Sequence, residues 1–350
     1  MTSLAGVHST LPTNRYTQAE LTQAFTEVCL GPDGNRGLLE RFHGHARVSS
    51  RHLALPVEQY ATIGDFGESN DLFITHAVEL GAAALTGALQ RAGIGADEVD
   101  VVISTTITGV AVPSIEARIA ESVGLRPDVK RVPLFGLGCV AGAAGIARLH
   151  DYLVGHPDEV AALVSVELCS LTLQREDRSV ANLVASGLFG DGAAAVVAVG
   201  ANRPEPGPRV VDSRSHLYPD SLRTMGWDVG RGGLKIVLDA EVPAIVQQYL
   251  GDDVRSFLAA HSLRVEDVAA WVSHPGGPKV IEAIEAALGL DTNPLEFTWR
   301  SLDQIGNLSS SSVLHVLRDT LDGRCLTAGT PGIVMAMGPG FCSELVLLEW

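Results

Sequence analysis

Apolar runs alternate with helix-type patterns along most of this chain, and this alternation limits the folds that it can adopt. Strand-like runs occur at residues 101–105, 161–166, 193–199, 270–274 and 332–337. Helical patterns lie between them, at residues 71–92, 141–153 and 280–288. Continuous apolar strands in regular alternation with helices are typical of a sheet that helices cover on both faces. The sequence therefore predicts an α/β fold.

The two halves of the chain share a local pattern. Residues 95–105 read GADEVDVVIST and residues 264–274 read RVEDVAAWVSH, so each runs from an acidic turn into a strand. Between the halves, residues 200–208 are rich in proline and glycine, as linkers often are. We interpret the chain as an internal duplication, with an N-terminal half at 1–200 and a C-terminal half at 208–350.

Charge and cysteine content exclude several classes of function. The formal net charge of −16 argues against binding to a nucleic-acid backbone. The five cysteines are scattered without a CxxC pair, which predicts neither a disulfide framework nor a metal site. The N-terminus has no signal-peptide pattern, and no uninterrupted apolar run reaches the roughly 18 residues that span a bilayer. We expect a cytoplasmic protein without a membrane span.

Cys139 lies in the run VPLFGLGCVAGAAG at residues 132–145. This pattern predicts a short strand, a turn at Gly136 and Gly138, and a helix of small residues that begins near the cysteine. The amide groups at a helix N-terminus favour an anion, which lowers the pKa of a thiol placed there. The residues alone leave two interpretations open, a nucleophilic cysteine and a buried structural one.

Three further motifs carry polar groups in glycine-rich or small-residue surroundings. His274 ends a predicted strand and begins HPGGP, and Asn307 stands in GNLSSSS before an apolar helix. Residues 338–341, GPGF, lie between two predicted strands near the C-terminus. Each has an ordinary structural interpretation as well: a core histidine, a helix N-cap and a tight turn.

Together with LFGDGAA at residues 188–194, these motifs resemble the chalcone/stilbene synthase family, the type III polyketide synthases. The resemblance is nearest to actinobacterial members that make alkylpyrones and alkylresorcinols. It implies a thiolase-type fold, with two pseudo-duplicated halves in five α/β/α/β/α layers, and a homodimer.

The resemblance also implies a role for each polar residue. Cys139 takes the starter from an acyl-CoA and holds the growing chain as a thioester. His274 pairs with the cysteine as an imidazolium, and joins Asn307 in donating hydrogen bonds to malonyl-CoA as it loses CO2. The CoA thioesters are substrates, and no other cofactor is implied.

Further residues are implied to shape the substrate sites. Phe189 is the expected gatekeeper, and Val112 is expected to reach across the dimer into the partner's cavity. Ile236 stands where a second gatekeeper phenylalanine is expected, which predicts a wider cavity and a medium- or long-chain fatty acyl starter. The other cavity residues implied are Thr108, Cys169, Thr172, Gly338 and Pro339. The residues implied to contact coenzyme A are Arg47, Arg51, Gly276, Gly277 and Lys279.

Two other functions remain open at this point. A ketoacyl synthase III would share the fold but catalyse a single condensation, although HPGGP and GPGF argue against that family. A non-catalytic partner subunit would keep the fold alone, although the retention of all three polar residues argues against it.

Overall fold

The computed structural model describes residues 1–30, 35–291 and 293–350. In this part of the chain, nine strands form one mixed sheet, which divides into two halves of similar topology. The N-terminal half contains, in spatial order, β5 (Lys130–Phe135), β4 (Val99–Thr106), β6 (Val160–Leu168), β7 (Asp191–Val199) and β1 (Thr2–Thr10). The C-terminal half continues with β8 (Arg209–Leu217), β13 (Cys342–Glu349), β12 (Pro331–Gly338) and β11 (Ala270–Ser273).

The strand directions repeat between the halves. β4 is parallel to β6, which is antiparallel to β7, which is antiparallel to β1. In the same way β11 is parallel to β12, which is antiparallel to β13, which is antiparallel to β8. The acidic turns before β4 and β11 also match, because Glu98 accepts from the Gly95 amide and Asp267 from the Arg264 amide. The shared pattern seen in the sequence is therefore a structural repeat.

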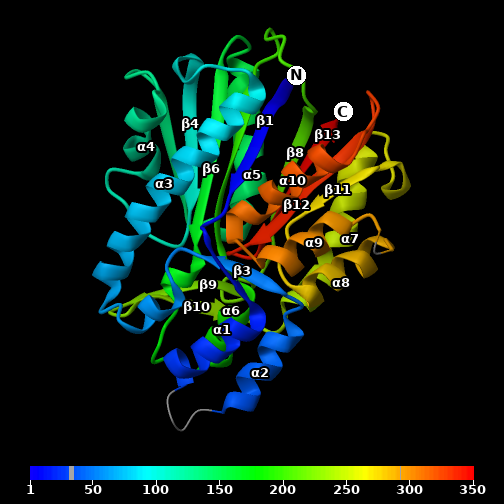
Figure 1. Ribbon diagram of the computed structural model, residues 1–350. Coiled ribbons are helices and arrows are strands. Elements are labelled where there is room, and N and C mark those ends of the chain that lie inside the picture. The colour runs from blue at the N-terminus through cyan, green and yellow to red at the C-terminus, as the bar shows by residue number, and fades with distance from the viewer. Residues whose placement is uncertain (31–34, 292) are drawn as a thin grey trace.

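Helices complete five layers around the two halves of the sheet (Figure 1). The central layer is α5 (Ala141–Gly155) with α10 (Ser312–Gly323), whose apolar side chains share one core with the inner faces of both half-sheets. One outer layer contains α3 (Phe66–Ala92) and α4 (Ile115–Val123). The other contains α7 (Val242–Ala260), α8 (Pro278–Leu288) and α9 (Glu296–Ile305). The predicted α/β thiolase-type fold is confirmed.

Helix α3 is long and apolar. By length and composition alone it could cross a membrane, and among the described residues it is the only helix that could. Its buried side chains, including Phe73, Ala77 and Leu85, pack into the core formed with β6 and β7. This packing is that of a long core helix, and such a helix can match a membrane helix in length and composition.

A group of short elements closes one end of the sheet (Figure 1). They are the hairpin β9 (Met225–Gly230) and β10 (Gly233–Leu238), the pair β2 (Asn14–Thr17) and β3 (Ser50–Leu53), and the helices α1 (Gln18–Phe25), α2 (Arg36–His45) and α6 (Val180–Leu188). The candidate site lies between these elements and the ends of the central helices.

Candidate active site

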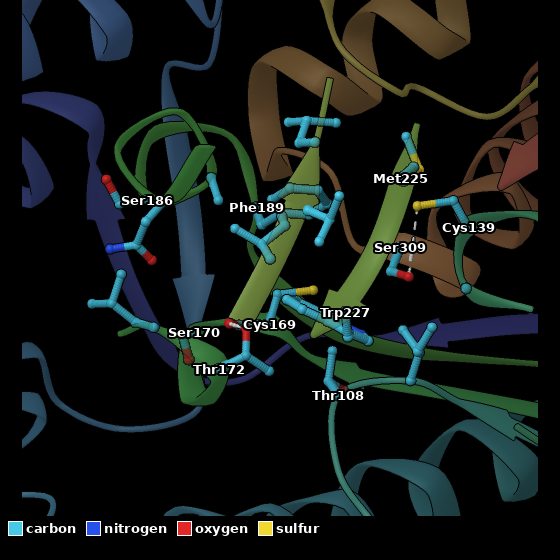
Figure 2. Close-up of a pocket in the computed structure, with 18 of the residues that line it drawn as sticks. Thr108, Cys139, Cys169, Ser170, Thr172, Ser186, Phe189, Met225, Trp227 and Ser309 are labelled. Carbon is cyan, nitrogen blue, oxygen red and sulfur yellow. Dashed lines mark hydrogen bonds between the residues drawn. The ribbon is translucent and has the colours of Figure 1, made fainter. Parts of the chain in front are cut away.

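Two cavities meet at Cys139. The larger has a volume of about 800 Å³ and the smaller about 550 Å³, in both cases including the open mouth. Both are lined by Cys139, Phe189, Met225 and Leu238, so these side chains form the boundary between them. Figure 2 shows Cys139 at one side of the larger cavity and Phe189 near its middle.

A 3₁₀ turn at Gly138–Val140 positions Cys139 directly before α5, close to the predicted helix start. Gly138 has a φ of +57°, and a Cβ atom there would lie 2.7 Å from the ring of Pro339. Only glycine therefore fits this turn. The Cys139 Sγ lies 3.7 Å from the Ser309 Oγ, to which it donates a hydrogen bond (Figure 2).

Burial controls the protonation of the cysteine and the histidine. Burial raises the pKa of the Cys139 thiol to about 12, and lowers the pKa of the His274 imidazole to about 3. Burial thus opposes the lowering of the thiol pKa that a helix N-terminus would produce. It favours the neutral form of each group, whereas the resemblance implies a thiolate and an imidazolium.

His274 follows the last residue of β11 and lines the smaller cavity with Cys139 and Asn307. Within the described part of the chain, neither ring nitrogen of His274 has a hydrogen-bond partner. A buried polar group without a partner is costly. The ring is therefore available to a substrate or to the cysteine, whereas a core histidine would be satisfied.

Backbone contacts hold Asn307 beside Phe189. The backbone N–H of Asn307 donates to the backbone carbonyl of Leu188 at 2.9 Å. The backbone N–H of Gly190 donates to the backbone carbonyl of Asn307 at 3.0 Å. The Asn307 side chain accepts from the Ser309 amide at 2.8 Å and donates to the Gly276 carbonyl at 3.3 Å. The side-chain oxygen is thus used locally, while Nδ2 retains a second hydrogen to donate.

Glu167 is a site-forming residue that the motifs did not single out. Its Oε2 accepts from the Ile107 amide at 3.0 Å and from the Thr108 Oγ1 at 2.9 Å, while Oε1 accepts from the Ser310 hydroxyl. It therefore joins the segment after β4 to the segment after Asn307. An acidic residue within the apolar run VAALVSVEL was the available signal.

The expected cavity residues largely come together. Thr108, Cys169, Thr172, Phe189, Ile236 and Pro339 all line the larger cavity. Gly338 supports the turn of Cys139 instead, since a Cβ atom there would lie 2.7 Å from the Leu137 carbonyl oxygen. Val112 is 88% exposed in the loop before α4. Its expected reach into the cavity of a partner subunit stays a prediction.

Trp227 changes the interpretation of Ile236. The two residues are paired across the β9–β10 hairpin, and both line the larger cavity. Directly opposed residues of an antiparallel pair lie on the same face. Trp227 therefore supplies this wall with an aromatic ring from the strand opposite Ile236.

The residues expected to contact coenzyme A lie in different environments. Gly276 lines the smaller cavity, Gly277 precedes α8, and Lys279 is exposed on its first turn. Arg47 is exposed, forms an ion pair with Glu282 at 3.0 Å and lies over Trp299. Arg51 is only 1% exposed and donates to the Phe189 carbonyl at 2.7 Å, a setting that does not favour the expected contact with a coenzyme A phosphate.

Comparison with known proteins agrees with this geometry. Residues 3–203 match the N-terminal domain of chalcone and stilbene synthases, and residues 209–349 match the C-terminal domain. The chain is 54% identical over 352 residues to a 1,3,6,8-tetrahydroxynaphthalene synthase of Streptomyces peucetius subsp. caesius, covering 100% of this chain and 93% of that protein. A putative chalcone synthase of Bacillus subtilis (strain 168) is 35% identical over 317 residues, 87% of each chain.

A solved structure has the same fold. The 1,3,6,8-tetrahydroxynaphthalene synthase of Streptomyces coelicolor A3(2), described as a bacterial type III polyketide synthase, aligns with a TM-score of 0.94. The alignment covers 99% of both chains at 29% identity.

Proposed function

This chain belongs to the chalcone and stilbene synthase family and is a type III polyketide synthase, and from that premise we propose that it joins two-carbon units from malonyl-CoA on Cys139 into an aromatic pentaketide of the tetrahydroxynaphthalene type. The observation that carries the proposal is the meeting of Cys139, His274 and Asn307 at one small cavity beside a larger one.

Loading begins with a neutral thiol. Cys139 Sγ attacks the thioester carbonyl of an acyl-CoA while its proton passes to a free ring nitrogen of His274. The imidazolium then returns that proton to the departing coenzyme A thiolate. The acyl group stays on Cys139, and coenzyme A leaves as a thiol. The imidazolium thus exists during transfer and not in the free site.

Extension uses the donors of the smaller cavity. The second Nδ2 hydrogen of Asn307 and an N–H of His274 point to the thioester oxygen of malonyl-CoA, where negative charge develops as CO2 leaves. The resulting enolate carbon attacks the acyl carbon on Cys139, and the Cys139 sulfur leaves and takes a proton from water. The lengthened chain is then a thioester of coenzyme A, and it returns to Cys139 by the loading step before the next extension. The apolar ring of Phe189, at the boundary of both cavities, favours loss of the charged carboxylate as a neutral gas.

Carbon counting and the cavity wall support this product. The ten ring carbons of tetrahydroxynaphthalene equal five two-carbon units with five carbonyl oxygens. Of the two ring closures, one loses water and the other releases the thioester sulfur, which leaves four oxygens. No carbon remains for an alkyl chain. Trp227 supports this choice, because its ring limits the space available to a long starter.

A medium- or long-chain acyl starter that gives an alkylpyrone or alkylresorcinol is the second candidate. It is favoured by Ile236, which replaces a larger aromatic ring, and by the mainly apolar residues around the larger cavity. It also fits the general gain of about 0.8 kcal/mol for each methylene that a chain buries.

We further propose that the chain acts in the cytoplasm as a homodimer. β5 is the edge of the sheet and carries the exposed Val132 and Phe135, and the nearby loop carries Val110 and Val112. An exposed apolar edge strand is usually covered by another surface.

The product is identified by incubating the pure protein with malonyl-CoA alone, and then with added hexanoyl-, lauroyl- or palmitoyl-CoA. Mass spectrometry of the first reaction should detect tetrahydroxynaphthalene or its oxidation product. If products form only when a long acyl-CoA is present, the second candidate is correct instead.

A further inference from the structure

Arg51 is a buried cation surrounded by neutral acceptors. Its Nη1 donates to the Phe189 carbonyl at 2.7 Å, and its Nε and Nη2 donate to the Gln18 Oε1 at 3.2 and 3.0 Å. The residue is 1% exposed, and the Phe25 ring lies 5.9 Å from its guanidinium carbon. It belongs to β3, far in sequence from the motifs around Cys139, His274 and Asn307.

The structure provides no counter-ion for this charge. Among the described residues, no carboxylate forms an ion pair with Arg51 within 4.0 Å. Asp191 contributes opposing charge, but its oxygens accept from the Ala54 backbone amide, the Ser170 backbone amide and the Ser170 hydroxyl. Burial lowers the pKa of Arg51 to about 9, which still leaves it charged at neutral pH. Buried charges are normally paired, because an unpaired one is costly.

Arg51 also lines the larger cavity, together with Phe25, Leu53 and Ser186. A guanidinium has five N–H donors, and three of them are used by the Gln18 and Phe189 oxygens. The two that remain are one on Nη1 and one on Nη2, and N–H groups of these two nitrogens can bind a single carboxylate. An anionic ligand in this cavity would therefore meet a cation that lacks a partner.

We propose that Arg51 binds the free carboxylate of a malonyl group that Cys139 carries as the starter unit. This inference rests on the proposed function, because it requires malonyl-CoA to serve as starter as well as extender. The ligand class is a short acyl thioester that ends in a carboxylate. Arg51 is thus the counter-ion of the starter, and the starter is the counter-ion of Arg51.

The pairing separates the fates of two malonyl groups. A carboxylate held by a cation is stabilised as an anion, so the starter loses CO2 more slowly. The extender malonyl-CoA reaches His274 and Asn307 beside the ring of Phe189, where the described lining residues include no lysine or arginine to oppose the loss of its carboxylate. A starter that keeps its carboxylate gives eleven carbons after four extensions. One CO2 must then leave during ring closure to give ten ring carbons.

The alternative is that Arg51 only anchors the backbone at Phe189. The test therefore compares a charged and a neutral thioester of nearly the same shape, malonyl-CoA and acetoacetyl-CoA. The reaction is run in an Asn307→Ala background, in which decarboxylation is slow, and loading of Cys139 is followed by intact-protein mass spectrometry. Arg51→Met removes the charge, and Arg51→Lys keeps it. Arg175→Met is the control for loss of a backbone anchor. Arg51 donates to one backbone carbonyl and Arg175 to two, but Arg175 lies outside the larger cavity.

We expect Arg51→Met to lower the ratio of malonyl to acetoacetyl loading at least tenfold, while Arg51→Lys and Arg175→Met change it less than threefold. An unchanged ratio in a folded Arg51→Met protein overturns the proposal. Should Arg51→Met fail to fold, the ratio in the Asn307→Ala protein itself decides, and equal loading of the two thioesters is the contrary result. A protein that shows the expected ratio but makes a product other than tetrahydroxynaphthalene contradicts the proposed product and leaves the role of Arg51 intact.

Discussion

Trp227 and Ile236 lie directly opposite one another on the β9–β10 hairpin, and both side chains border the cavity that contains Cys139. Figure 2 shows Trp227 in this lining with Phe189, Met225 and Cys169. The isoleucine alone suggests a wide cavity. The pair shows that one strand supplies the ring that its neighbour lacks, so the two positions must be judged together.

We predict that Trp227→Ala shifts the enzyme towards longer starters. Six additional buried methylenes at about 0.8 kcal/mol each could give a few kcal/mol after ordering costs. The kcat/KM for lauroyl-CoA should therefore rise at least tenfold relative to that for malonyl-CoA. Ile236→Phe should have the opposite and smaller effect. Trp350→Ala is the control, because this tryptophan packs on Gly332 away from the cavity. A starter profile that Trp227→Ala leaves unchanged contradicts this account of the wall.

Cys139→Ala should abolish chain extension while the protein remains folded, because Cys139 is the thiol that meets His274 and Asn307 at the smaller cavity. Product formation from malonyl-CoA is the measurement, with circular dichroism as the test of folding. Iodoacetamide should alkylate Cys139 faster than Cys169, whose pKa burial raises well above its usual value. A Cys139→Ala protein that still formed polyketides would exclude Cys139 as the nucleophile.

His274→Ala and Asn307→Ala should each slow malonyl-CoA decarboxylation by about two to three orders of magnitude, the usual cost of losing an oxyanion donor. Release of labelled CO2 measures this step apart from loading. Ser301→Ala, a buried serine on α9 outside both cavities, should decarboxylate at the wild-type rate. Normal decarboxylation by His274→Ala would remove His274 from the mechanism.

His315 should make the fold sensitive to acid. It is buried on α10, where burial lowers its pKa from 6.5 to about 3. The unfolded chain binds a proton below pH 6.5 that the folded chain does not, so stability falls as the pH is lowered from 6.5 towards 3. A pH of 5 lies 1.5 units below the unfolded-state pKa of 6.5, which corresponds to a loss of about 2 kcal/mol in the free energy of unfolding.

The measurement for His315 is urea unfolding of the wild type and of His315→Gln at pH 7 and pH 5. Between pH 7 and pH 5, the free energy of unfolding should fall by about 2 kcal/mol more for the wild type than for the variant. Equal losses would show that His315 is protonated in the folded protein. The comparison of two proteins cancels the opposite effect of Asp191, whose pKa burial raises to about 6.

The sequence predicts those features of the fold that depend on local pattern. The alternation of strands and helices, the repeat at residues 95–105 and 264–274, and the turn before Cys139 all follow from spacing and residue type. The packing of α3 on one face of the sheet cannot be predicted in this way, because the composition of this helix also fits a membrane helix.

Features that depend on the environment of a side chain cannot be predicted from the sequence motifs. The high pKa of Cys139 results from burial by residues distant in sequence. From the sequence, Arg51 could be an exposed basic residue. In the structure, β3 packs beside Phe189 and buries the Arg51 side chain. Trp227 belongs to no motif and reaches the cavity only through the register of the hairpin.

Growth of the polyketide on Cys139 can be observed by rapid-quench mass spectrometry of the peptide that contains this residue, after the protein is mixed with malonyl-CoA alone. We expect a ladder of adducts on Cys139, in which each adduct is longer than the previous one by a two-carbon ketide unit, and no such ladder on Cys169. A ladder on another residue, or a single adduct that never grows, would show that Cys139 does not carry the growing chain.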